Sequence, residues 1–233
     1  NYIQWINRPE NAPILSHQLF KKKVFPILDE DKSTFFILID NLRFDQWKII
    51  NEVITDYFRL EEEINYFSIL PTATQYARNA IFSGLTPLEM EKRFPKLWQN
   101  DEDEGGKNLY EDKFLDDQIK RLYRKPIKHS YTKVLTLEQG KDVLDNLGNF
   151  MHNQLNVLVY NFVDMLSHAR TDSSMIRELA NDEAAYRSLT LSWFEHSPLL
   201  EALKWLSQKK VRIIITTAHG TIRVKKPSKL VGD

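Results

Sequence analysis

The sequence predicts an α/β fold with a largely parallel central sheet, and two observations indicate it. Three apolar segments, residues 34–39, 156–163 and 211–217, have the length and continuity of strands that are buried on both faces. The stretches between them repeat apolar residues at helical spacing. Strands that alternate with helices in this way are typical of a sheet whose strands run in parallel.

Each apolar segment also leads into polar residues. Asp40 follows the first segment, Asp164 follows the second, and His219 with Gly220 follows the third. Since chemistry in open α/β sheets gathers at the carboxyl ends of the strands, we expect these side chains to lie at one edge of the sheet. This repetition is the main functional signal of the sequence.

Composition narrows the classes of protein further. The chain has 233 residues, with 32 Lys and Arg against 32 Asp and Glu, so its formal charge of zero gives no support for a general nucleic-acid or membrane-surface binder. There are no cysteine ligands, because the chain contains no cysteine, and any metal must be held by histidine and carboxylate. No apolar run approaches the roughly 18 residues of a membrane span, and no signal peptide is visible, so we expect a cytoplasmic protein with no membrane segment.

The first third of the chain contains two well-marked helices. Residues 1–34 are expected to form a helical lead-in segment, a linker from a probable upstream domain. Residues 44–57 have helical spacing, and residues 64–70 are expected to be extended. Residues 74–83 follow as a helix, for which Thr74 can serve as the N-cap and Gly84 as the C-terminal stop.

The remaining elements alternate in the order expected of an α/β domain. Residues 85–135 are expected to form a cap or insertion that includes a helix near residues 110–123 and a strand at 128–135. Further helices are predicted at residues 137–151, at 175–194 and from Pro198 onward.

Five residues at these positions can carry chemistry, although each also has an ordinary structural role. Asp40 can bind a metal or simply end a strand, and Thr74 can be a nucleophile or a plain N-cap. Asp164 and His168, four residues apart, can converge on one divalent ion, or can be a capping acid and a surface histidine. His219 can ligate, act as an acid or base, or be a buried structural residue.

Taken in order, these residues resemble the alkaline phosphatase superfamily, and within it the PglZ domain. The segments 39–47 (IDNLRFDQW) and 70–80 (LPTATQYARNA) look like the effector half of PorX-type response regulators. The resemblance covers residues 35–233. It implies a three-layer α/β/α sandwich of the alkaline phosphatase type.

The resemblance also implies a site with two zinc ions. Asp40, Thr74 and His219 match the ligands of one ion, and Asp164 and His168 match ligands of the other. Thr74 matches the attacking group, because it stands ten positions before Gly84, the spacing of the superfamily nucleophile. Three neighbouring residues are candidates for substrate contacts: Arg43, Arg78 and Asn79.

The implied activity is hydrolysis of a nucleotide-type phosphodiester. The implied setting is a response regulator that controls type IX secretion, in which an upstream receiver domain is phosphorylated and promotes formation of a homodimer.

Two departures from the family pattern predict that this chain is inactive or nearly so. Ala218 stands where the family has a metal-ligating aspartate, which removes one negative charge from the ligand set, so we expect zinc occupancy to be reduced or absent in this chain. An alanine fits a natural change and an introduced one equally. The superfamily also supplies a further histidine to the second ion, but no histidine follows His219, so we expect part of the C-terminal region to be missing. The alternative is a non-catalytic output module with a degraded metal site.

Overall fold

The computed structural model describes residues 1–8, 10, 12–99, 106–222, 224 and 226. The first half of the chain forms, in order, α1 (Tyr2–Asn7), η2 (Ser16–Gln18), η3 (Phe20–Val24), η4 (Phe25–Ile27), β1 (Ser33–Ile39), α2 (Phe44–Ile54), α3 (Thr74–Ser83), α4 (Pro87–Arg93), α5 (Glu111–Gln118) and η5 (Ile119–Tyr123). The second half forms β2 (His129–Val134), α6 (Leu137–Asp145), α7 (Leu147–Phe150), β3 (Leu155–Tyr160), α8 (Phe162–Asp172), α9 (Ser174–Leu179), α10 (Glu183–Glu195), α11 (Pro198–Ser207) and β4 (Val211–Thr216).

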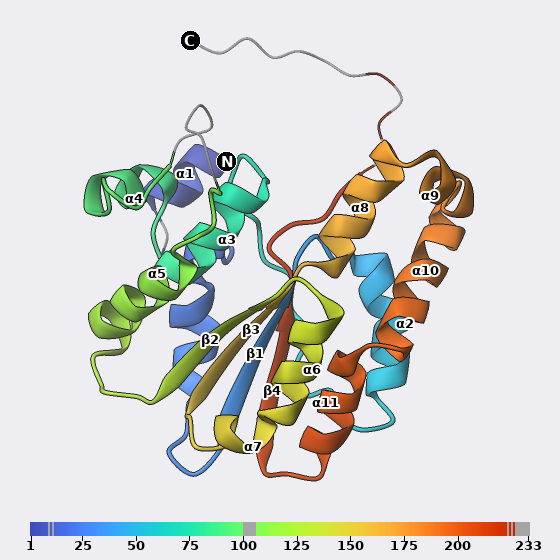
Figure 1. The fold of residues 1–233 in the computed structure, drawn as a ribbon. Helices are drawn as coiled ribbons and strands as arrows, with labels where there is room; N and C mark the ends of the chain where they lie inside the picture. The colour runs from blue at the N-terminus through green and yellow to red at the C-terminus, as the bar shows by residue number, and fades with distance from the viewer. Residues whose placement is uncertain (9, 11, 100–105, 223, 225, 227–233) are drawn as a thin grey trace.

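The centre of the domain is a four-stranded sheet with the order β2-β3-β1-β4 (Figure 1). All of its pairings are parallel. The two inner strands, β1 and β3, are buried along their whole length, as their continuous apolar sequences predict. Strand β4 lies at an edge and is only partly buried.

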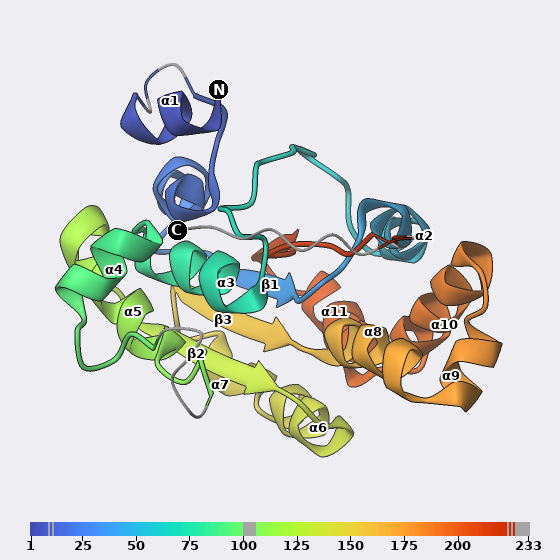
Figure 2. The same cartoon turned by 90° about the horizontal axis from the view of Figure 1, so that it is seen from above.

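Helices cover both faces of the sheet, which confirms the predicted sandwich (Figures 1 and 2). Alternate residues of β1 point to opposite faces. Phe36 and Leu38 pack in a core with α3, α5 and η3, whereas Phe35, Ile37 and Ile39 pack in a second core with α2, α6, α10 and α11. The carboxyl ends of all four strands therefore open between two helical layers.

Several predicted elements differ from the observed ones. The segment 64–70, predicted to be extended, is not a strand of the sheet, and in the described chain it forms one β-bridge, between Phe67 and Leu15. The predicted helix at 137–151 divides into α6 and α7 at Asn146. The predicted helix at 175–194 divides into α9 and α10, since Asp182 caps the new start by accepting a hydrogen bond from the backbone N–H of Ala185 at 2.8 Å.

Two segments that the sequence sets apart pack into the same cores as the sheet. Phe20 and Val24, within residues 1–34, are fully buried in the core on the α3 side. Within residues 85–135, β2 is a strand of the central sheet, and Phe114 of α5 is buried in that same core. Both segments help to hold the layer that carries α3.

In the part of the chain that the structure describes, no helix has both the length and the apolar character needed to cross a membrane.

Candidate metal centre

Asp40 comes directly after β1 and is fully buried. Its backbone N–H donates to the carbonyl of Tyr160 at 2.9 Å, which continues the pairing of β1 with β3 by one residue. One carboxylate oxygen, Oδ2, accepts from Arg78 at 3.0 Å. The other, Oδ1, is buried and has no hydrogen-bond partner in the described structure. A buried acceptor without a partner is costly, and a bound cation would satisfy it.

Asp164 reaches the same place from the other central strand. The sequence predicts a strand that runs to this residue, but β3 ends at Tyr160 and Asp164 lies in the first turn of α8. Its Oδ1 accepts from the Asn41 amide at 3.1 Å. Asn41 has a left-handed backbone with φ of 61°, a conformation in which asparagine is enriched, and this turn aims its amide at Asp164.

His219 and Thr74 complete the cluster from two further elements. His219 follows β4, and its Nε2 lies 3.7 Å from Oδ1 of Asp40 and 2.9 Å from the hydroxyl oxygen of Thr74. Thr74 is the first residue of α3, and the N-cap is Ala73, so the prediction that Thr74 caps the helix is wrong. Its hydroxyl lies instead beside the imidazole of His219.

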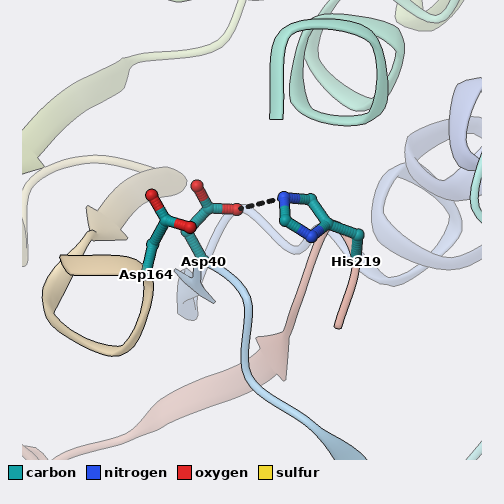
Figure 3. A group of neighbouring side chains, drawn as sticks. All are labelled: Asp40, Asp164 and His219. Atoms are coloured by element: carbon teal, nitrogen blue, oxygen red, sulfur yellow. Dashed lines mark ion pairs between the residues drawn. The ribbon is translucent and has the colours of Figure 1, made fainter. Parts of the chain in front are cut away.

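One atom each from Asp40, Asp164 and His219 lie within 4.8 Å of one another. Figure 3 shows the two carboxylates side by side, with the imidazole ring facing Asp40. Two carboxylates and one imidazole are donors that suit a divalent ion such as zinc. Four segments far apart in sequence therefore bring these three donors and the Thr74 hydroxyl to one point at the carboxyl edge of the sheet.

A match to a known family decides what kind of domain this is. Residues 19–233 match the family described as the BREX system PglZ alkaline phosphatase-like domain. The chain belongs to the PglZ family. A search among curated proteins finds no match. The match begins within the lead-in segment, in agreement with the burial of Phe20 and Val24 in the core of the domain. Its superfamily suggests that the PglZ domain is a phosphoesterase.

A buried charge network holds Asp40 in this PglZ domain. Arg78 of α3 is 1 % exposed and lies between Asp40 and Glu111, whose carboxylate accepts from it at 2.8 and 2.5 Å. Burial raises the pKa of Asp40, while the charges of Arg78 and His219 oppose that shift. Burial would also raise the pKa of Glu111, but Arg78 and Lys133 outweigh it and the pKa falls below its ordinary value. A cation at Oδ1 would offset the desolvation of Asp40.

His168 and Ala218 differ from the other predicted positions. His168 lies one turn after Asp164 on α8, with its Nε2 3.7 Å from Oδ2 of that residue, but 75 % of its side chain is exposed. Ala218 is 1 % exposed and packs in the core on the α3 side, next to His219. Among the described residues, therefore, the compact group of three donors includes neither position.

Three further histidines lie away from this cluster. His129 begins β2 and His152 precedes β3, which places both at the amino edge of a parallel sheet, opposite the candidate site. His196 follows α10, where its Nδ1 lies 2.8 Å from the carbonyl oxygen of Ser192.

The three residues predicted to contact substrate all bond to protein groups. Arg43 pairs with Asp45 and Glu183. Arg78 is enclosed by its carboxylates, and Asn79 donates to the backbone of Lys107 at 3.1 Å. In this structure Arg78 acts on Asp40, whereas Asn79 fixes the loop that precedes α5.

Two residues at the site are not singled out by sequence reasoning. Asn41 orients Asp164, and its place between a strand and a helix start was the available signal. Glu111 is fully buried although it lies in the first turn of α5, where an acid is ordinarily a solvated helix-start residue. Only the fold reveals its contact with Arg78, 33 positions away.

Proposed function

We propose that this PglZ domain is a metal-dependent phosphodiesterase that acts on nucleotide-type substrates with Thr74 as the nucleophile. The observation that carries the proposal is the position of the Thr74 hydroxyl, 2.9 Å from Nε2 of His219, which forms a compact donor group with Asp40 and Asp164. A threonine hydroxyl is a weak nucleophile unless a neighbouring group stabilises its alkoxide. A metal ion held by the donor group next to Thr74 would stabilise this alkoxide.

Zinc is the ion we propose, because one imidazole and two carboxylates form a donor set that zinc accepts, and because zinc is the metal that the family resemblance implies. Asp40, Asp164 and His219 would hold one ion beside Thr74. His168, next to Asp164, is the residue available for a second ion. When bound, the metal would supply Lewis acidity that favours the alkoxide of Thr74 and balances charge on the phosphoryl oxygens.

The reaction then follows from the position of the chain's own groups. Oγ1 of Thr74 gives up its proton to solvent and forms a bond to phosphorus while the bond to the leaving oxygen breaks. The leaving oxygen keeps that electron pair, takes up a proton from solvent and departs as the alcohol. Water next attacks the phosphothreonine, which releases a phosphomonoester and restores the hydroxyl. The amino end of the ten-residue helix α3, where Thr74 lies, favours the negative charge of the phosphoryl group throughout.

Ala218 bears on how active the chain is. An aspartate at this position would add a negative charge beside His219, and its loss weakens the attraction for a divalent ion. We therefore expect the chain to hydrolyse phosphodiesters slowly or not at all. The same observation favours a second candidate function, in which the domain is a non-catalytic output module that kept its sheet and lost its metal.

We also propose a setting for the domain, from the similarity of residues 39–47 and 70–80 to PorX-type effectors. In this setting the domain is the output half of a response regulator that controls type IX secretion. A receiver domain upstream would regulate it, and activation would bring two copies together.

The test of the proposed function is to restore the missing carboxylate. The A218D protein, supplied with zinc, is expected to hydrolyse bis-(p-nitrophenyl) phosphate faster than the parent chain does. The control carries T74A in the same background and removes only the attacking oxygen. Equal hydrolysis by A218D and by the double variant would contradict the proposal. Failure of both the parent and A218D to bind zinc in calorimetry would favour the output module.

A further inference from the structure

A pocket shares helix α8 and the segment after β4 with the candidate metal centre. This open pocket of about 320 Å³ is lined by α8, by the segment from α9 to α10, by the chain that follows β4 and by Arg43. Its polar lining consists mainly of Arg43, Ser167, Arg170, Arg177, Tyr186 and Thr221. We call it the arginine pocket.

The arginine pocket shares two structural elements with the donor cluster. Helix α8 carries Asp164 at its first turn and Ser167 and Thr171 at positions three and seven residues further, which lie on the same side of a helix. The chain after β4 carries His219 and then Thr221. A ligand that reaches the donor cluster can therefore extend along α8 into the pocket.

Positive charge exceeds negative charge in this pocket and in its direct ion pairs. Arg43 pairs with Asp45 and Glu183, and Arg170 pairs with the same Glu183. Asp45 is shared in turn with Arg187. Two carboxylates therefore pair with three guanidinium groups, and Arg177 adds a fourth positive charge.

Arg177 is the guanidinium without an acidic partner. Among the residues that the structure describes, no carboxylate oxygen lies within 4.0 Å of its nitrogens. It donates to the backbone carbonyl of Thr171, which fixes one end of the group at the pocket wall. A guanidinium that is held in place and not neutralised is suited to bind an anion.

Tyr186 gives the pocket a rigid side. Its side chain is 1 % exposed, and the guanidinium carbons of Arg170 and Arg43 lie 4.7 and 5.6 Å from the centre of its ring. Gly220 lies close to Arg43, because a Cβ added there would be 3.4 Å from Cγ of that arginine. These contacts hold the pocket's cations beside the segment that carries His219.

From these observations we infer that the arginine pocket binds a second phosphoryl group of the substrate, one that does not react. The inference rests on the proposed function and deepens it. It identifies the substrate class as nucleotides that carry a further phosphate besides the scissile phosphodiester. Arginine suits this task, because its planar fork can bond two phosphate oxygens at once.

Binding can be tested without any catalysis. Calorimetry with inorganic pyrophosphate, in the presence of a chelator, is expected to show binding to the parent chain. R177Q should weaken it by about tenfold or more, the equivalent of roughly 1.4 kcal/mol. The matched control is R93Q, which removes an arginine of α4 that pairs with Asp117. Absence of binding by the parent, or equal binding by R177Q and the parent, would overturn the inference.

The assignment to substrate is tested by two related compounds. Thymidine 5′-(p-nitrophenyl phosphate) has only the scissile phosphodiester, and its 3′-phosphorylated derivative carries a second phosphoryl group. In the A218D background, R177Q should raise KM for the derivative alone and leave kcat unchanged. An equal rise for both compounds would refute the assignment to substrate. If neither compound is hydrolysed, the proposed function fails while calorimetry still decides whether the pocket binds phosphate.

Discussion

The buried pair of Arg78 and Glu111 allows a prediction with a defined magnitude. Neither side chain is more than 1 % exposed, and Oε1 and Oε2 of Glu111 accept from Nε and Nη2 of Arg78 at 2.8 and 2.5 Å. The same carboxylate accepts from Tyr131 at 2.6 Å and lies 2.9 Å from Nζ of Lys133. E111Q keeps the shape of the side chain and removes its charge, so two cations lose their shared counterion.

Breaking a buried pair by neutralising one partner costs about 3–5 kcal/mol. In a domain of this size each kcal/mol lowers Tm by about 2–4 °C, so E111Q should lower Tm by roughly 6–20 °C. Thermal unfolding followed by circular dichroism measures this shift. E62Q is the matched control, because it neutralises an acid whose pair with Lys23 is exposed, and its Tm should stay close to that of the parent chain.

The same carboxylate gives the stability a pH dependence of known sign. The pKa of Glu111 is lower in the folded protein than its ordinary value, so its contribution is present above the unfolded pKa of about 4.3 and is lost as pH falls through the folded pKa. E111Q should flatten the loss of stability below that pH. If the Tm values of E111Q and E62Q coincide at neutral pH, the network does not stabilise the fold as reasoned here.

Three further outcomes are expected. N41A removes the amide that orients Asp164 and should weaken zinc binding in calorimetry by about tenfold. This is the lower end of the usual effect of losing a group that orients a metal ligand. An unchanged zinc affinity would show that Asp164 does not need this support. G84A should lower the free energy of unfolding by at least about 1–2 kcal/mol, because φ at this position is 63° and an added Cβ would lie 2.2 Å from Nε2 of Gln118. Denaturant titration measures this change, and an unchanged free energy of unfolding would contradict the prediction. T74S should keep hydrolysis in the A218D background and T74A should abolish it, a contrast that fails if the hydroxyl is not the attacking group.

The sheet could be predicted because its strands are marked by local sequence. Strand β1 reads as an unbroken apolar run, and its burial on both faces follows directly from that run. Residues 64–70 have a similar apolar content, but in the described part of the chain they join no sheet and form a single β-bridge, between Phe67 and Leu15. Whether an apolar segment pairs as a strand depends on which other strand lies beside it in the fold. The local sequence does not contain that information.

The candidate site was predictable to the same extent. Asp40 and His219 follow strands, so parallel topology brings them to one edge of the sheet. The partners of Arg78 were not predictable, because α3 and α5 meet only through the packing of the layer above the sheet, and helical spacing gives Glu111 the pattern of a solvated acid. Burial of charge is a property of the assembled layers.

The most direct test of the central claim is anomalous diffraction at the zinc edge from crystals of the A218D protein soaked in zinc, because Ala218 weakens the attraction for the ion in the parent chain. We predict a peak at about 2.0–2.2 Å from a carboxylate oxygen of Asp40, a carboxylate oxygen of Asp164 and Nε2 of His219. Zinc peaks elsewhere on the protein with none at these three donors would contradict it.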